Sequence, residues 1–138
     1  MEEIEVSEVF PVSQKELYLA WLDSAKHSAF TGSKAKIEPK NGGRFKAWDG
    51  YIQGKTIKLE PYSKIIQTWR TTDFPDSSKD SRLEVKFEKV KAGTKITFRH
   101  SKIPKGQGEE YKQGWIDYYF KPMKKYFKKK ILKTKKNE

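Results

Sequence analysis

The sequence predicts an α+β fold in which a curved antiparallel sheet of about seven strands wraps around a long C-terminal helix, with two short helices after the first strand. Three observations predict it: a wide apolar face at helical spacing near the C-terminus, a long middle region that alternates with a period of two, and helix-type spacing directly after the first strand. A helix with such a face must cover a large apolar surface, and the alternating middle region supplies one.

Residues 3–10 predict the first strand. Its inward face is expected to carry Ile4, Val6 and Phe10. Glu8 falls in the same register, which leaves two alternatives. Its carboxyl group points into the interior, where burial would raise its pKa, or a bulge after Ser7 turns it outward.

Capping signals predict the two short helices that follow. Ser13 is placed to cap the first helix, and Glu16 three residues later completes a capping box. Ser24 is expected to cap the second helix, which would run to about Phe30.

Residues 34–103 predict six more strands joined by turns. The expected strands are 34–39, 44–48, 51–59, 64–71, 82–91 and 94–103. Asn41-Gly42-Gly43 and Asp49-Gly50 are typical of hairpin turns that need positive φ. Gly54 lies inside a strand and predicts a bulge or a close backbone approach.

The C-terminal helix carries two apolar stripes. The first is Ile116, Phe120, Met123 and Phe127, and the second is Tyr111, Trp115, Tyr118, Pro122 and Tyr126. Pro122 has no N–H to donate, so we expect a kink and a Tyr118 carbonyl without its usual partner.

Length and composition fit one domain, which we place at residues 1–132, followed by a disordered lysine-rich tail at 133–138. The chain has no cysteine and two histidines, so neither a metal site nor a cofactor is expected. The acidic N-terminus does not resemble a signal peptide, and no apolar run approaches the roughly 20 residues needed to span a bilayer. A cytoplasmic protein is expected.

The net charge of +12 is concentrated at the C-terminal end, where residues 121–138 hold nine lysines and one glutamate. Such a charge can attract nucleic acid or an anionic membrane. The stretch has no arginine, the residue suited to bidentate phosphate and base contacts, and its lysines fit the solvated face of a terminal helix. Neither nucleic acid nor a membrane is expected as the main partner, and weak association through the tail remains a third hypothesis.

A set of short motifs occurs in a characteristic order over nearly the whole chain. They are Leu17-Tyr18, Trp21-Leu22, Phe30-Thr31-Gly32, Gly42-Gly43-Arg44-Phe45, the run from Trp48 to Gly54, Thr68-Trp69-Arg70, Gly93-Thr94, Ile103-Pro104, Gly114-Trp115, Tyr118-Tyr119 and Pro122. In this set the chain resembles the heat-shock protein 90 ATPase activator homologue family, within the START-related helix-grip (SRPBCC) superfamily. The element order derived above agrees with the helix-grip fold.

The resemblance implies a role in chaperone regulation and the stress response, with a chaperone or another protein as a partner. In the eukaryotic activators a domain of this type follows an N-terminal domain to which stimulation of the chaperone ATPase is chiefly attributed, so that activity is not expected of this chain alone. Other helix-grip relatives bind lipids, sterols, polyketides or plant hormones beneath the long helix, and some act as cyclases.

No residue pattern predicts catalysis. His100 is the best acid–base candidate, beside Phe98 on an inward face, but it fits equally a half-exposed or backbone-bonded histidine. Gln67 is in register with inward residues and would offer a ligand one polar group. The chain is therefore not expected to be an enzyme, and no residue is assigned as catalytic.

The favoured hypothesis is a small hydrophobic ligand held between the sheet and the C-terminal helix. The expected ligand-binding residues are Leu17, Trp21, Phe45, Gln67, Trp69, Val85, Phe98, His100, Trp115, Tyr119 and Met123. Trp48 and the other tyrosines are further candidates. The alternative is that these rings only fill the core and that the module binds a protein through its surface. A cavity of several hundred cubic ångströms would favour a ligand, and a solid core would favour a protein partner.

Overall fold

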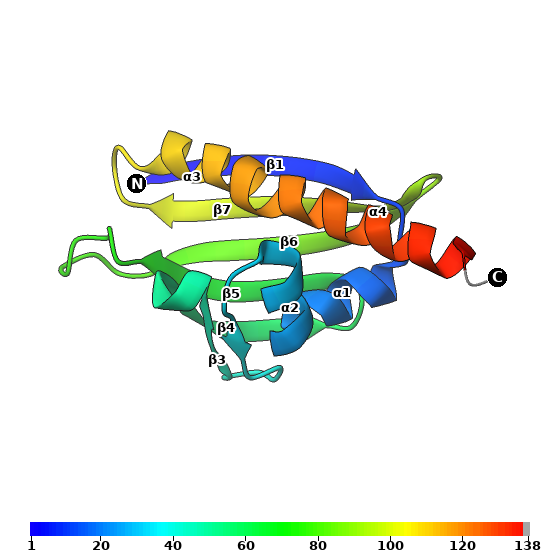
Figure 1. Ribbon diagram of the computed structural model, residues 1–138. Helices are drawn as coiled ribbons and strands as arrows, with labels where there is room; N and C mark the ends of the chain where they lie inside the picture. Colours follow the sequence, from blue (N-terminus) through cyan, green and yellow to red (C-terminus); the bar gives the residue numbers. More distant parts are fainter. Residues whose placement is uncertain (137–138) are drawn as a thin grey trace.

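A seven-stranded antiparallel sheet forms the body of the protein in the computed structural model (Figure 1), which describes residues 1–136, with side chains described to Lys130. The strand order is β1-β7-β6-β5-β4-β3-β2. The strands are β1 (Glu2–Phe10), β2 (Lys36–Ile37), β3 (Arg44–Ala47), β4 (Ile52–Glu60), β5 (Lys64–Thr71), β6 (Ser81–Val90) and β7 (Gly93–Ile103).

All the longer helices lie on one face of this sheet. They are α1 (Gln14–Leu22), α2 (Ser24–Thr31), α3 (Gly108–Gly114), the π-helical segment η2 (Trp115–Phe120) and α4 (Lys121–Lys136). Figure 1 shows α3, η2 and α4 as one long helix running along β1 and β7, and α1 and α2 in front of the strands from β4 to β6. This arrangement confirms the predicted α+β helix-grip architecture.

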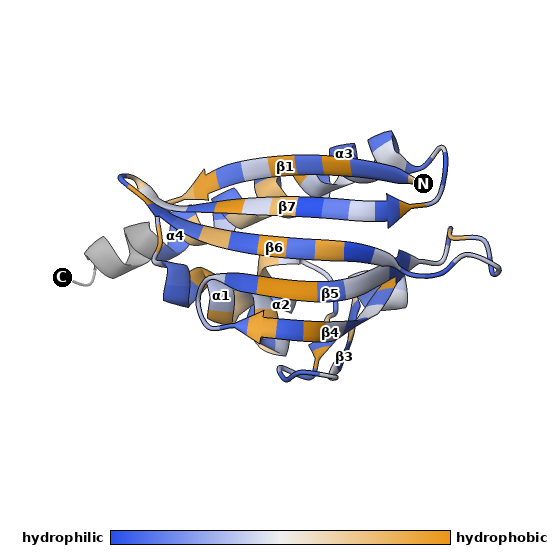
Figure 2. Cartoon of the chain, turned by 180° about the vertical axis from the view of Figure 1, so that it is seen from behind, coloured by the Kyte–Doolittle hydropathy of each residue, from blue (hydrophilic) through white to orange (hydrophobic). Residues whose placement is uncertain are grey.

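The strands have the predicted alternation between a buried and an exposed face. In β6 the inward residues are Leu83, Val85 and Phe87, each no more than 2% exposed. Seen from behind, hydrophilic and hydrophobic residues alternate along the strands (Figure 2). A sheet with one apolar face must be covered on that face, and the helices cover it.

The capping of the short helices is partly as predicted. The Ser13 hydroxyl accepts a hydrogen bond from the Glu16 N–H at 3.1 Å, which confirms the first N-cap. The second N-cap is Asp23, whose carboxylate accepts from the Lys26 N–H at 2.8 Å, so the assignment to Ser24 is wrong. The Ser24 hydroxyl instead bonds the backbone of Ile37, joining α2 to β2.

Two of the predicted strands are shorter than expected. Only Lys36–Ile37 of the 34–39 segment pairs with β3, and β3 ends at Ala47 because Trp48 has a positive φ. The Asp49-Gly50 turn is confirmed: both residues have positive φ, and the Tyr51 N–H bonds the Trp48 carbonyl at 3.1 Å.

The predicted close approach at Gly54 is present. A methyl group there would collide with the Thr68 carbonyl oxygen and lie 2.7 Å from the Phe45 ring. The bulge in β4 is elsewhere, between Thr56 and Lys58.

Replacing Gly54 by alanine is therefore expected to lower the free energy of unfolding by about 3 kcal/mol, because a strand backbone must move to accept the methyl group. Gly114→Ala is the matched control, since its new methyl group would lie 3.9 Å from the Tyr118 ring on a helical backbone. It should be neutral or stabilise by about 0.5–1 kcal/mol. Urea denaturation of both variants tests this, and equal effects would contradict the close approach.

Pro122 predicted a kink in the long helix. The structure has a π-helical turn, Trp115–Phe120, directly before the segment that contains Pro122. The Lys121 N–H bonds the Ile116 carbonyl, five residues back. Pro122 cannot donate to the preceding turn, and a π turn is a common way to absorb such a break.

This π turn changes which residues face the sheet. At the wider spacing Tyr119 and Phe120 both follow Trp115 inward, and Tyr118 is 61% exposed. The predicted placement of Tyr118 in an inward stripe is therefore wrong, whereas Phe120, Met123 and Phe127 are buried as expected.

Ion pairs hold α4 to the rest of the protein. Lys124 lies 3.3 Å from Glu8 and Lys130 lies 2.8 Å from Glu16. The pairing of β1 with β7 is continuous from Ile4 to Phe10, so neither alternative for Glu8 is observed: there is no bulge after Ser7, and the half-buried carboxylate faces the helix. Because α4 is helical to Lys136, it extends past the predicted domain limit at residue 132. Residues 137–138 of the predicted tail lie outside the described residues.

Candidate functional site

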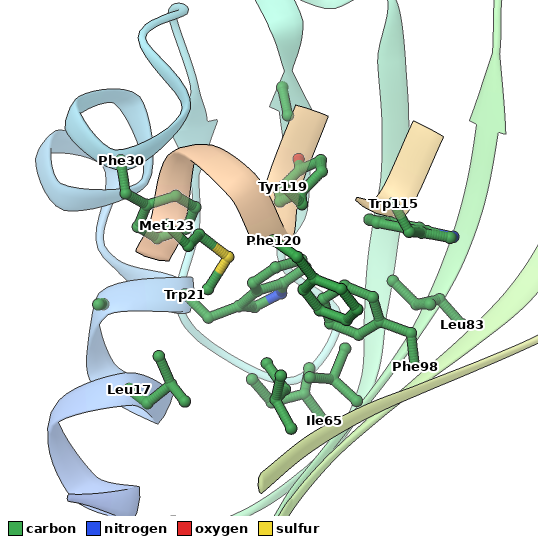
Figure 3. Packing of buried hydrophobic residues seen from close by; sticks show 14 of the residues in the cluster. Leu17, Trp21, Phe30, Ile65, Leu83, Phe98, Trp115, Tyr119, Phe120 and Met123 are labelled. Atoms are coloured by element: carbon green, nitrogen blue, oxygen red, sulfur yellow. The ribbon is translucent and has the colours of Figure 1, made fainter. Parts of the chain in front are cut away.

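The space beneath the long helix, where a ligand was predicted, is filled by protein. All eleven predicted ligand-binding residues are buried, with exposed fractions between 0 and 7%. Figure 3 shows rings from α2, the sheet and the long helix packed around Trp21 of α1. The Trp21 ring centroid lies 5.3 Å from those of Phe98 and Tyr119, which leaves a solid core here.

Gln67 is occupied within this core. Its side-chain oxygen accepts from the Trp21 indole N–H at 3.3 Å, and its amide nitrogen donates to the Thr56 hydroxyl at 3.2 Å. Both ends of its amide therefore satisfy core groups, and its role as a ligand contact stays a prediction.

His100 is also fully engaged, in a chain of side chains. The Trp115 indole donates to His100 Nδ1 at 3.1 Å, His100 Nε2 bonds the Ser81 hydroxyl at 2.8 Å, and Ser81 donates to the Trp69 carbonyl at 2.6 Å. Burial lowers the pKa of His100 to about 3. The sequence suggested an acid–base group or a half-exposed histidine. In the structure His100 is a fully buried, uncharged imidazole whose two ring nitrogens are hydrogen-bonded within the core.

His27 is a second buried histidine, for which the sequence analysis predicted no role. Its Nδ1 donates to the Trp21 carbonyl at 2.8 Å, and its Nε2 accepts from the Tyr119 hydroxyl at 3.0 Å. Burial lowers its pKa to about 4, against a smaller opposing effect of the backbone bond. Its position on the inward side of a helix was the only sequence signal.

An open groove of about 400 Å³ lies between the long helix, the start of β4 and the end of β5. We call it the aromatic groove. Its lining residues are Trp48, Tyr51, Ile52, Trp69, Glu110, Tyr111, Gly114, Trp115, Tyr118 and Tyr119. Trp69, Trp115 and Tyr119 of the predicted site belong to it, and the other eight predicted residues do not line it.

Trp48 has an unusual conformation at the mouth of this groove. Its φ is 51° and that of Asp49 is 55°, a region that bulky side chains rarely adopt. Such backbone strain is often found at functional positions. The sequence signal was the Asp49-Gly50 pair, which predicts a hairpin turn but no unusual conformation at Trp48.

The Trp48 indole also has a buried hydrogen-bond donor. Its Nε1 is buried and, among the described residues, has no acceptor at ordinary geometry. Burial raises the pKa of the neighbouring Tyr119 phenol, and a hydrogen bond from the Trp48 side chain opposes that rise. Because Nε1 is buried, the Tyr119 hydroxyl is its acceptor within the protein, although the contact lies outside ordinary hydrogen-bond geometry.

Hydrogen-bonded tyrosines form one rim of the groove. The Tyr51 hydroxyl donates to the Asp73 carboxylate at 2.5 Å. The Tyr111 hydroxyl lies 2.7 Å from that of Thr71 and donates to the Gln107 side chain at 2.8 Å. Burial raises the pKa of both phenols, so these two hydroxyls are uncharged at physiological pH.

A second depression, of about 640 Å³, lies beside the β6–β7 turn and the start of α1. It is larger, but half of its lining residues are polar or lysine, and they include one aromatic ring, that of Tyr62. Ligand pockets are predominantly apolar, so the aromatic groove is the better candidate.

Two further properties concern the described part of the chain. In it, no three side chains of the histidine, aspartate and glutamate type come together as a metal site would require. None of its helices combines the length and the apolar character needed to cross a membrane.

Comparison with known proteins was decisive for the family. A family model described as "Activator of Hsp90 ATPase homolog 1-like protein" matches residues 11–128. The chain belongs to this family. The resemblance noted in the sequence is thereby confirmed.

Curated relatives of this activator family member carry matching names. "Activator of 90 kDa heat shock protein ATPase homolog 1" from Homo sapiens is 30% identical over 124 residues, which are 90% of this chain and 36% of that protein. A Dictyostelium discoideum homologue is 31% identical over 113 residues, 81% of this chain and 29% of that protein. The chain therefore spans about a third of the length of these relatives.

Solved structures agree on the fold. The crystal structure of an HSP90 activator from Plasmodium falciparum has a TM-score of 0.77 and 27% identity, and the match covers 87% of this chain and 91% of that one. The solution structure of an Aha1 dimer from Colwellia psychrerythraea has a TM-score of 0.75 at 16% identity, over 92% and 96% of the two chains, which is a likeness of fold alone.

Proposed function

We propose that this activator-family domain is a non-catalytic binding module that holds a small, flat apolar ligand in the aromatic groove. The observation that carries the proposal is a space of about 400 Å³ lined mainly by aromatic rings. Ligand pockets commonly measure about 300–1,000 Å³ and are mostly apolar with a few polar groups. The polar groups among its lining residues include the Tyr51 and Tyr111 hydroxyls and the Glu110 carboxylate.

The groove replaces the site expected beneath the helix. Rings fill that inner space, whereas at the groove the exposed Tyr118 and Tyr51 leave an entrance. Trp69, Trp115 and Tyr119 belong both to the core and to the groove, so a ligand in the groove would contact residues of the core.

The non-catalytic part of the proposal rests on the histidines. His27 and His100 are the strongest acid–base candidates in the sequence, and both are neutral, buried and bonded at both ring nitrogens. A group in this state has no access to a substrate proton.

An amide and indole N–H shift titration with fatty acids, sterols and flat polyphenols tests the proposal. We expect the largest shifts at Trp48, Trp69 and Trp115 for at least one flat ligand. Trp48→Ala should weaken binding, because it removes one of the aromatic rings that line the groove. Tyr62→Ala is the control, since this exposed ring does not line the groove. A panel without shifts in the groove would overturn the proposal.

A second candidate is contact with a 90 kDa heat-shock chaperone in the cytoplasm. It is favoured by the names of the relatives, which describe activators of that chaperone's ATPase. Adding this domain to the purified chaperone and measuring both binding and ATPase rate tests it. Binding without stimulation is expected, because the chain spans about a third of those relatives. Absence of binding would remove this candidate.

A further inference from the structure

The charge of the aromatic groove is opposite in sign to that of the protein. The chain has 30 Lys and Arg against 18 Asp and Glu, yet the ten residues that line the groove include no Lys or Arg and one carboxylate, that of Glu110. A second carboxylate, Asp73, lies at the rim, where it accepts from the Tyr51 hydroxyl. Since the effect of charges beyond about 8–10 Å is screened at physiological salt, the groups that line and border the groove contribute most to its local charge.

Several rings of the groove pack edge to face, with their planes close to perpendicular. Trp48 and Tyr118 pack with centroids 5.6 Å apart and planes at 74°, and Trp69 and Tyr111 at 5.0 Å and 80°. Trp48 also meets Tyr119 at 71°. Rings at near right angles around one space present several π faces to it, as in the aromatic cages that hold quaternary ammonium groups.

The phenols of this cage remain neutral. Burial raises the pKa of Tyr111, and the negative charges of Asp73 and Glu110 raise it further while Thr71 opposes them. A cation entering the groove would therefore meet uncharged ring faces and one exposed carboxylate, without a phenolate.

We propose that the natural ligand of the groove is a small organic cation with an alkylated ammonium group, held against the aromatic rings beside Glu110. This inference rests on the proposed function of the groove as a ligand site, and it replaces the neutral flat ligand proposed there with a cation whose alkyl groups contact the rings. An alkylated ammonium is favoured over a primary one because it has few or no N–H donors, and the tyrosine hydroxyls at the rim are already bonded within the protein.

The test compares choline with 3,3-dimethyl-1-butanol, its neutral carbon isostere, by titration of the tryptophan indole signals. The shapes and hydroxyl groups of the two probes match, so a difference in affinity reports the charge. We expect choline to bind about 10-fold more tightly. Glu110→Gln should lower choline affinity about 3-fold and leave the neutral probe unchanged.

Glu109→Gln is the matched control, because it removes the same charge from the neighbouring position, which does not line the groove. It should leave choline affinity unchanged. Equal affinity of the two probes, or equal loss in both glutamate variants, would overturn the cation assignment. If flat neutral ligands bind while choline does not, the assignment fails and the proposed function stands. If neither these probes nor the neutral panel binds, both fail.

Discussion

Acidification from pH 7 to about 4 is expected to remove roughly 6 kcal/mol of the free energy of unfolding, about 3 kcal/mol for each of the two buried histidines. Burial lowers the pKa of His27 to about 4 and that of His100 to about 3, from an ordinary value of 6.5. A difference of one pKa unit corresponds to about 1.4 kcal/mol.

The sign follows from proton binding. Between pH 6.5 and about 4 the unfolded chain binds protons at both histidines and the folded protein does not, so stability is complete above pH 6.5 and falls as the pH is lowered. The contacts of His100 explain its resistance to protonation. Its Nδ1 accepts from the Trp115 indole, which can only donate, so a proton there would set two donors against each other.

Urea denaturation at several pH values between 7.5 and 4 measures this effect. The variant His27→Gln/His100→Gln should be less stable at pH 7.5 but should lose most of the pH dependence above pH 5. An unchanged slope in that variant would show that other groups cause the acid sensitivity.

Trp115→Ala is expected to lower the free energy of unfolding by about 3–5 kcal/mol. Trp115 is 2% exposed, and its ring centroid lies 4.6 Å from that of Phe98 and 4.9 Å from that of Tyr119. The substitution leaves a cavity and also deprives His100 of a hydrogen-bond donor. The same experiment decides whether the ring belongs to the core or only lines the groove.

Tyr118→Ala is the control on the same helix. Its ring is 61% exposed, so the loss should be below about 1 kcal/mol. Both variants are measured by chemical denaturation at pH 7.5. A loss below about 1 kcal/mol for Trp115→Ala would mean that the ring lines an open space, and the solid core described here would be wrong.

The strands and caps could be predicted because their signals are local. The alternation of Leu83, Val85 and Phe87 identified β6, and the spacing from Ser13 to Glu16 identified the start of α1. The wide apolar face of the C-terminal helix likewise required a sheet to cover it. These patterns determined the fold class and the family resemblance.

The candidate site could be predicted only in part. The sequence placed Trp69, Trp115 and Tyr119 on inward faces, but it did not show whether those faces enclose a cavity. That depends on how side chains from distant segments fill the space. The rings of Trp21, Phe98 and Phe120 close the centre, so the open volume lies at the end of the sheet.

The sequence by itself determined the sheet, its inward face and the helix that covers it, because side-chain periodicity follows directly from backbone geometry. Only the tertiary structure decided the rotation of that helix, the left-handed turn at Trp48 and the position of the aromatic groove. The π turn before Pro122 is accompanied by exposure of Tyr118, which the predicted stripe had placed inward beside Trp115. These features arise from packing between segments far apart in the chain, which no local pattern records.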